Sequence, residues 1–255
     1  LFRSSIVVTG GPMLPGKFEG RDIVMSQLDE AFLGGMQAAK FSEQQILEME
    51  EVACPGPGAC SLMGTANTMQ ILTEALGMSL SGSATIPAVS SQRLMAARRS
   101  GRQIVELVKE GLIPSRIMTR QALLNAIVVD LAIGGSTNAV LHLLAFAREL
   151  GIELTLDDFD KQSRKVPCIC SVIPNGPHTV VDFHDAGGAP SVMNELKDLL
   201  HLDCLTVNGN SLGENLAGKT SGNRKGISEI THPFDETGGL ALLQGNLAPR
   251  GAIAR

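Results

Sequence analysis

Residues 119–151, TRQALLNAIVVDLAIGGSTNAVLHLLAFARELG, give the most direct indication of the fold. An apolar-periodic segment at 119–132 leads into a glycine loop, GGSTN, at 134–138. A helix is predicted after this loop, and Gly151 stands where helices commonly end on glycine. The apolar stripe of that helix consists of Val140, Leu143, Leu144 and Ala147. A hydrophobic fraction of 44% over the whole chain provides for a sizeable buried core.

The segments on either side alternate between strand-like and helical patterns. SSIVVTGG at 4–11 is typical of a buried strand feeding a loop, and VPCICSVI at 166–173 has the period-two pattern of another buried strand. Capping residues, apolar stripes and closing glycines predict helices at 41–53, 65–76, 91–111, 155–165 and 190–200. Strands alternating with helices predict an α/β fold with a doubly wound, largely parallel sheet.

The composition changes after about residue 205, which suggests a division into domains. Residues 1–205 are predicted to form the α/β domain. Residues 206–239 are rich in Gly, Asn, Ser and Thr without a helical stripe, and we interpret them as a linker or extended crossing. Residues 240–255 resume a strand-like pattern, as at the start of a β-rich C-terminal domain. The chain begins with Leu1 and stops soon after this new element, so we expect an internal fragment of a longer protein.

Composition and charge exclude several classes of function. The net charge of −5, with eight Phe and neither Trp nor Tyr, argues against phosphate tracking and base stacking on nucleic acid. No apolar run approaches the roughly 18–20 residues that span a bilayer, and the N-terminal stretch lacks the pattern of a signal peptide. These features predict a soluble protein of the cytoplasm that binds neither nucleic acid nor membrane.

Five cysteines, an odd number without export signals, favour a reducing compartment over a disulfide framework. No pair has the C-x2-C spacing of a zinc ribbon. Cys168 and Cys170 alternate with apolar residues, and we interpret them, together with Cys204, as inert core thiols.

The most unusual segment is CPGPGAC, from Cys54 to Cys60. Its prolines and glycines fix the backbone and let it approach a ligand, and a helix start carrying Thr65 and Asn67 follows directly. Such a helix start can hold a carboxylate or lower the pKa of a thiol. The loop can therefore present a thiolate to a metal cluster or as a nucleophile. A rigid turn with two buried cysteines explains the same residues.

GGSTN at 134–138 is a second glycine loop at a helix start, without the lysine or the spacing of a Walker motif. Loops at the carboxyl ends of parallel strands usually build the binding site of an α/β protein. We therefore predict that Thr65, Asn67, Ser136 and Thr137 lie together, near the carboxylate end of a small acid.

The remaining polar residues carry weaker signals. His142 lies on an apolar helix and is predicted to be a core residue, while His178 and His184 lack a recognised ligand spacing. Asp182 and Asp185 fit either metal ligands or a surface turn before two glycines. A basic helix side fits a solvated face or, in part, a phosphate site; it carries Arg93, Arg98, Arg99 and Arg102. We find no Ser-His-Asp or Cys-His arrangement.

Residues 54–88, CPGPGACSLMGTANTMQILTEALGMSLSGSATIPA, resemble the signature of the dihydroxy-acid dehydratase and phosphogluconate dehydratase family. The remaining matching stretches follow in order along the chain: VTGGPMLPG, DLAIGGSTNAVLHLLA, FHDAGGAPSVMNEL and ETGGLALLQGNLAPRGAIAR. The resemblance therefore covers essentially the whole chain, as the N-terminal domain of such an enzyme without its first part.

The resemblance implies a hydro-lyase that removes water from a 2,3-dihydroxy acid or a sugar acid to give a 2-keto acid. It also implies an iron–sulfur cluster, of the 2Fe-2S or 4Fe-4S type, and Mg2+. The cluster cysteine in the G-A-C part of the family motif corresponds to Cys60, and Cys54 is the second choice. A homodimer or higher homo-oligomer is expected for the full-length protein.

Several family features have no counterpart in the chain. The other cluster cysteines, the Mg2+ ligands and the catalytic serine of the family belong to segments before and after the matched region. We therefore expect no catalytic residue here and predict that the isolated chain is inactive. Residues 61–64, SLMG, differ from the Gly-Gly-Met-Tyr of many branched-chain enzymes. Dihydroxy-acid dehydration in branched-chain amino-acid synthesis is our first interpretation, with sugar-acid or 6-phosphogluconate dehydration and a non-catalytic binding or interface module as alternatives.

Overall fold

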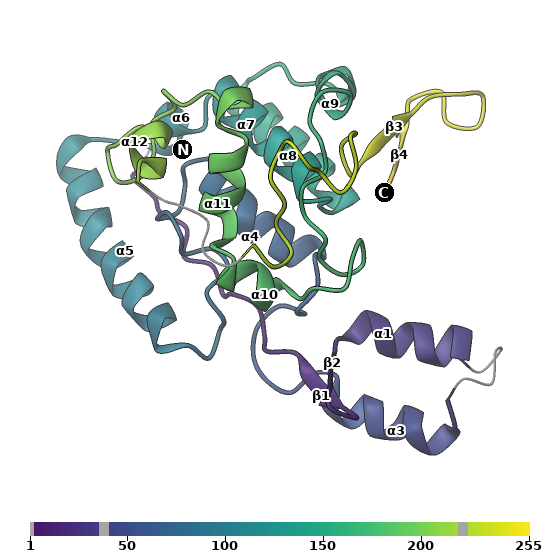
Figure 1. Ribbon diagram of the computed structural model, residues 1–255. Coiled ribbons are helices and arrows are strands. Elements are labelled where there is room, and N and C mark those ends of the chain that lie inside the picture. Colours follow the sequence, from purple (N-terminus) through teal and green to yellow (C-terminus); the bar gives the residue numbers. More distant parts are fainter. Residues whose placement is uncertain (1–2, 36–40, 219–223) are drawn as a thin grey trace.

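The computed structural model describes residues 3–35, 41–218 and 224–255, and it is mainly helical (Figure 1). Its helices, including one π-helical segment (η1) and one 3-10 segment (η2), are α1 Met25–Glu30, η1 Ala31–Gly35, α3 Glu43–Val52, α4 Thr65–Ala75, α5 Ser91–Glu110, α6 Pro114–Ile117, α7 Arg120–Ala132, α8 Thr137–Leu150, α9 Leu156–Ser163, α10 Val180–Asp185, α11 Gly188–Glu195, η2 Lys197–Leu199 and α12 Leu212–Leu216. The strands are β1 Gly16–Phe18, β2 Arg21–Ile23, β3 Ala241–Leu243 and β4 Ala252–Ala254. Each pair of strands forms a separate antiparallel ribbon.

Helix α7 lies at the centre of the main core, where it contacts α4, α8, α9 and α11. Thr119 caps its first turn, and nearly every residue from 122 to 132 is buried. The polar side chain of Asn125 is accommodated because it exchanges two hydrogen bonds with the backbone of His201, at 3.0 and 2.8 Å. A helix that is apolar on all sides packs favourably only when other helices surround it.

The sequence signals for helix ends are confirmed. Ser42 and Gln45 form the predicted capping box of α3, and Ser136 caps α8. Gly77, Gly111 and Gly151 follow α4, α5 and α8 with φ angles of 76°, 64° and 68°. This left-handed conformation favours glycine, so these positions end their helices as predicted.

The prediction of a doubly wound parallel sheet is wrong. Among the described residues, parallel pairing is limited to two isolated bridges, Pro12 with Ala59 and Val172 with His178. Residues 4–11 are not in a strand, and Val8 is 47% exposed. The backbone N–H of Val7 donates instead to the carbonyl of Met78. A short apolar run does not distinguish a sheet strand from an extended segment lying on helices, because both bury only part of their side chains.

Other local predictions also need correction. His142 is exposed on α8, since it falls outside the buried stripe. Arg93 is buried, whereas the other arginines of α5 are exposed. Cys168 and Cys170 are buried as predicted but form only isolated bridges, with Asp235 and Ile227.

The segment after residue 205 contains more structure than its composition predicted. Residues 212–216 form the short helix α12, which Ser211 caps. Residues 219–223 of the predicted linker lie outside the described residues. The strand-like pattern after residue 240 is confirmed by the β3–β4 hairpin, in which Ala241 pairs with Ala254.

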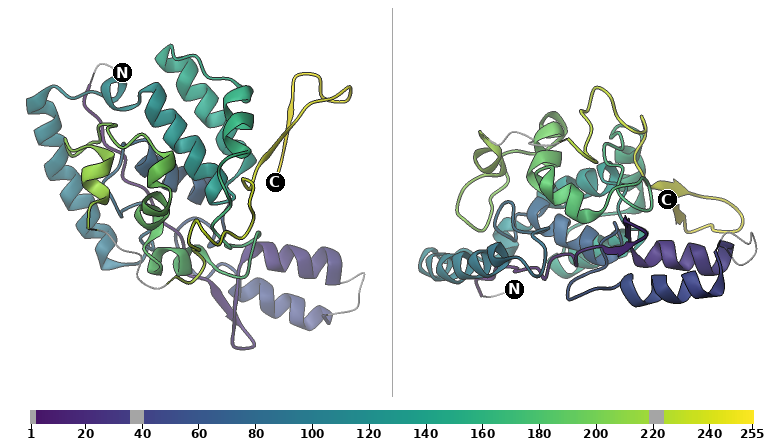
Figure 2. Two further views of the ribbon diagram at one scale, coloured as in Figure 1. Left: turned by 45° about the horizontal axis from the view of Figure 1, so that its top comes forward. Right: turned by 60° about the horizontal axis from the view of Figure 1, so that its bottom comes forward.

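Strands β1 and β2, with α1 and α3, form an arm that projects from the main body (Figures 1 and 2). This arm has a small core of its own, consisting of Ile23, Leu28, Ala31, Ile46, Met49 and Ala53. Within the described part of the chain, none of the helices combines the length and apolar character needed to cross a membrane.

The central position of α7 predicts a large stability difference between two leucines. Leu131 on α7 is 0% exposed and Leu141 on α8 is 63% exposed. We expect Leu131→Ala to lower the free energy of unfolding by about 2–5 kcal/mol, because it leaves a cavity. The matched control Leu141→Ala should change it by less than about 0.5 kcal/mol. Urea unfolding measures both values, and similar losses in the two variants would contradict the central role of α7.

Candidate functional site

The cysteine loop is held against the N-terminal segment. The N–H of Met13 donates to the carbonyl of Ala59 at 2.7 Å, and the N–H of Ala59 donates to the carbonyl of Gly11 at 2.9 Å. Gly58 has a φ of 122°, and a Cβ there would overlap the backbone of residues 12 and 13. Cys54 and Cys60 are both exposed free thiols. The alternative of two buried cysteines in a turn is therefore wrong, and the loop presents its thiols to the surface.

The loop passes directly into the start of α4. The side-chain amide of Asn67 donates to the carbonyl groups of Cys60 and Leu62, so it holds the loop against the helix. The N-cap position is Gly64, which supplies no side-chain acceptor for the first-turn N–H groups. The hydroxyl of Ser61 is buried and has no hydrogen-bond partner. This helix start thus retains unused donors, as an anion site does.

The second glycine loop lies against the first. The hydroxyl groups of Thr65 and Ser136 are 2.8 Å apart, and the side-chain amide of Asn138 donates to Thr65 Oγ1 at 3.0 Å. The N–H of Ser136 donates to Thr68 Oγ1 at 3.1 Å. Thr137, the first residue of α8, is half-buried next to this contact. Two helix N-termini, 71 positions apart in sequence, therefore meet at one place.

A buried carboxyl group that sequence analysis missed lies behind this contact. Asp130 is 0% exposed, and both of its carboxylate oxygens lack a hydrogen-bond partner. Burial raises the pKa of Asp130 well above its usual value. A Cβ added at Gly135 would overlap Asp130 Oδ1 and press on Thr68. The available signal was one acidic residue in an otherwise apolar segment.

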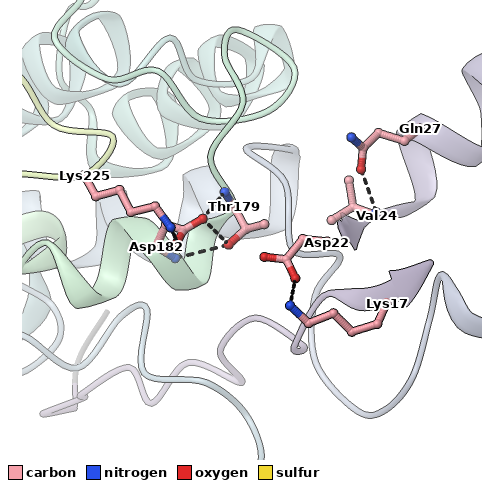
Figure 3. A network of polar contacts seen from close by, with 7 residues as sticks. All are labelled: Lys17, Asp22, Val24, Gln27, Thr179, Asp182 and Lys225. Carbon is pink, nitrogen blue, oxygen red and sulfur yellow. Dashed lines mark hydrogen bonds and ion pairs between the residues drawn. The ribbon is translucent and has the colours of Figure 1, made fainter. Parts of the chain in front are cut away.

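Helix capping explains one of the two acidic residues, Asp182 and Asp185, that precede Gly187 and Gly188. Asp182 accepts hydrogen bonds from the backbone and side chain of Thr179 and forms an ion pair with Lys225 at 2.6 Å (Figure 3). Burial raises the pKa of Asp182, but these hydrogen bonds outweigh burial and leave it below its usual value. Asp182 therefore closes the start of α10, and Asp185 is exposed.

His184 and Arg93 lie beside a neighbouring loop. The ring Nδ1 of His184 is 3.2 Å from Thr85 Oγ1. Burial lowers the pKa of His184, and the charge of Arg93 lowers it further against the opposing effect of Asp185. The guanidinium group of Arg93 donates to the backbone carbonyl of Thr9 in the N-terminal segment and to that of Ser83, which lies in the same loop as Thr85. Arg93 therefore ties two segments together, so the prediction of a solvated face is wrong for this residue. The prediction is confirmed for Arg98, Arg99 and Arg102, which are exposed.

The other three thiols differ from those of the loop. Cys168 and Cys170 are buried as predicted, whereas Cys204 is only half-buried. Burial raises the pKa of all three, so these thiols stay protonated. Among the residues that the structure describes, no three His, Cys, Asp or Glu side chains gather closely enough to hold a metal ion. The described residues therefore supply single thiols, and they do not complete a metal centre.

These features define a helical domain in which an exposed cysteine loop leads to two abutting helix starts. Residues 1–215 match the family model described as "Dihydroxy-acid/6-phosphogluconate dehydratase N-terminal". The chain belongs to this family, which confirms the resemblance found in its motifs.

Curated relatives agree with this assignment. Proteins described as dihydroxy-acid dehydratase are 48% identical in Methanothermobacter thermautotrophicus, 47% in Halothermothrix orenii and 47% in Carboxydothermus hydrogenoformans. Each similarity covers 98% of this chain and 46% of the relative. The chain thus spans about half the length of the curated relatives it matches.

Close packing at the second loop predicts opposite effects of the same substitution at two glycines. Gly135→Ala should lower the free energy of unfolding by about 1–3 kcal/mol, because the new Cβ overlaps Asp130. Gly101→Ala in α5 meets no atom within 4 Å and should raise stability by about 0.5–1 kcal/mol. Chemical denaturation measures both changes, and equal effects at the two positions would contradict the described packing.

Proposed function

We propose that this chain is part of a hydro-lyase that removes water from a 2,3-dihydroxy carboxylic acid to give a 2-keto acid. Family membership and relatives described as dihydroxy-acid dehydratase support this proposal. The structural observation that carries it is the contact between Thr65 and Ser136, which joins two helix starts at one place. A sugar acid or 6-phosphogluconate is the second candidate substrate, because the family description includes that activity.

The paired helix starts suit the carboxylate end of such an acid. Unpaired N–H groups and positive helix-dipole ends attract a carboxylate, and hydroxyl groups can donate to it. We assign the hydroxyl groups of Thr65, Ser136 and Thr137 to this role. The side chain of Asn67 is occupied by the cysteine loop and by Gln70, so its contribution is the backbone N–H in the first turn of α4.

Cys60 is proposed as one ligand of an iron–sulfur cluster, with Cys54 as the second choice. Both thiols are exposed on a loop with fixed backbone contacts, which suits a cluster donor. A cluster usually needs three or four thiolates, so the other ligands and those of Mg2+ belong to parts of the protein outside this chain. When bound, a cluster iron with an open position supplies a Lewis acid for the departing hydroxyl group.

Three further expectations remain predictions. The complete protein is expected to form a homodimer or higher homo-oligomer and to act in the cytoplasm. The isolated chain is expected to be inactive, because the described residues do not complete a metal centre. A non-catalytic binding module would also leave the isolated chain inactive, so the decisive experiments use the complete protein.

The first experiment measures substrate turnover and its dependence on Ser136. We expect the complete protein to dehydrate 2,3-dihydroxyisovalerate in preference to 6-phosphogluconate. Ser136→Ala should raise KM for the preferred acid roughly tenfold, because a hydroxyl donor to a charged group is lost. Steady-state measurement of keto-acid formation gives both results.

The matched control is Ser115→Ala, at an exposed serine on α6. Its KM should equal that of the wild type. Preference for 6-phosphogluconate would favour the second candidate, and turnover of neither acid would favour the non-catalytic module. An unchanged KM in Ser136→Ala would contradict the proposal that the paired helix starts bind the substrate.

The second experiment tests the cluster ligand. Cys60→Ser in the complete protein should lose most of its bound iron and its dehydratase activity, because serine is a poor cluster ligand. Cys204→Ser is the control, since burial keeps that thiol protonated and unsuited to metal binding. Iron analysis and the absorption spectrum measure the outcome. Full iron content in Cys60→Ser would refute the assignment.

A further inference from the structure

Two side-chain amides on one face of α4 connect the cysteine loop to the N-terminal segment. Asn67 and Gln70 are three positions apart on the helix, so their side chains are neighbours. Gln70 Nε2 donates to Asn67 Oδ1 at 2.8 Å. Asn67 is 1% exposed and Gln70 is half-buried. This bond uses the NH2 group of Gln70 and the oxygen of Asn67, which leaves the oxygen of Gln70 and the NH2 group of Asn67 for other partners.

The backbone determines which way both amides face. The N–H of Gly11 donates to Gln70 Oε1, and an N–H group can only donate. At the other end, the carbonyl groups of Cys60 and Leu62 accept from Asn67 Nδ2, and a carbonyl group can only accept. Gln70 must therefore turn its NH2 group to Asn67, and Asn67 must turn its own NH2 group to the loop. Reversing either amide would place two donors or two acceptors against each other.

These bonds close a ring that includes the backbone of Cys60. The carbonyl of Gly11 accepts from the N–H of Ala59 at 2.9 Å, and the next residue, Cys60, returns to α4 through its own carbonyl. A Cβ at Gly11 would overlap the carbonyl oxygen of Ile86, so this side of the ring is packed without space against a neighbouring loop. The cysteine loop is thus held from two sides, by the N-terminal segment and by α4.

We propose that Gln70 is a positioning residue for the thiol of Cys60, which it holds in place by fixing the orientation of the Asn67 amide. Cys60 is exposed, so the backbone bonds of its loop determine where the thiol lies. Gln70 touches none of the loop directly; it acts through Asn67 on one side and through Gly11 on the other. The role toward a cluster thiolate rests on the proposed function, whereas the ring of hydrogen bonds does not.

Two substitutions separate this role from simple packing. Gln70→Glu keeps the size of the side chain and its acceptor for Gly11, but an ionised carboxylate cannot donate to Asn67. Gln70→Met removes the donor and the acceptor together. If residue 70 only fills space, Gln70→Glu leaves the cysteine loop unchanged. If it orients the amide of Asn67, both variants loosen the loop, and only Gln70→Met also releases the N–H of Gly11.

The first experiment measures amide hydrogen exchange in the complete protein. The N–H of Ala59 donates to Gly11, and the N–H of Leu62 donates to the carbonyl of Cys60 at 2.7 Å, so both report on the ring. We expect these two N–H groups to exchange roughly tenfold faster in Gln70→Glu and in Gln70→Met. The N–H of Gly11 should keep its protection in Gln70→Glu and lose it in Gln70→Met.

A double-mutant cycle tests whether Gln70 acts through Asn67. Asn67→Ala alone should speed exchange in the loop, because both donors to the loop are lost. Adding Gln70→Glu to Asn67→Ala should speed it no further. The matched control is Gln121→Glu, the same substitution at an exposed position of α7, and it should exchange like the wild type.

The second experiment follows the thiol of Cys60 itself. In the complete protein, Gln70→Glu should release iron to a chelator roughly tenfold faster than the wild type or Gln121→Glu, because the loop that carries the thiolate is less well held. KM for the dihydroxy acid should stay unchanged, since the contact between Thr65 and Ser136 is not part of the ring.

Each outcome decides the proposal. Unchanged exchange of the loop in Gln70→Glu, or additive effects in the double variant, would overturn the connection from Gln70 through Asn67 to the loop. Faster exchange with unchanged iron release would overturn the positioning of the thiol. If the wild-type protein contains no iron, the proposed cluster fails. Hydrogen exchange still decides the connection, and the rate at which iodoacetamide alkylates Cys60 then decides the positioning.

Discussion

The burial of α7 on every side is the constraint on which the rest of the structure depends. Helices α4, α8, α9 and α11 surround it, and among residues 122–132 only Leu124 is not fully buried. A helix in this position tolerates few polar groups. Asn125 is satisfied by the backbone, and Asp130 marks the point where the helix approaches the candidate site. The same packing explains why the chain turns sharply after α7, since α8 must return along it through Gly134 and Gly135.

That turn brings two helix starts together. Gly135 has no room for a side chain next to Asp130 and Thr68, and the small loop lets Ser136 reach Thr65. The cysteine loop runs into α4 and is held there by the side chain of Asn67. Substrate contacts, a cluster thiolate and a buried carboxylate would therefore lie around one short region. Under the proposed function, the chain would supply an anion site and one cluster thiol, and the remaining metal ligands would come from other parts of the protein.

Local features were predictable where single residues determine backbone geometry. Ser42, Gly77 and Gly151 marked helix ends because their side chains, or the lack of one, act within a single turn. The parallel sheet was wrong because strand pairing depends on distant partners. Within residues 4–11, the N–H of Val7 donates to the carbonyl of Met78, and the next residue, Pro12, forms only an isolated bridge with Ala59. Among the described residues no strand pairs with this segment. The predictions for His142 and Arg93 were wrong for a similar reason, because the burial of each side chain depends on which face of its helix meets the core.

By itself the sequence determined the family, the ends of several helices and the two loops that carry glycine, cysteine and hydroxyl residues, because these features are encoded in short motifs. The tertiary structure decided that Thr65 meets Ser136, that Cys60 is exposed while Cys170 is buried, and that the carboxyl group of Asp130 lies buried against Gly135. These relations join residues that are distant in sequence. Only the packing of helices around α7 brings them within reach, because side-chain contacts act over a few ångströms and no local pattern encodes them.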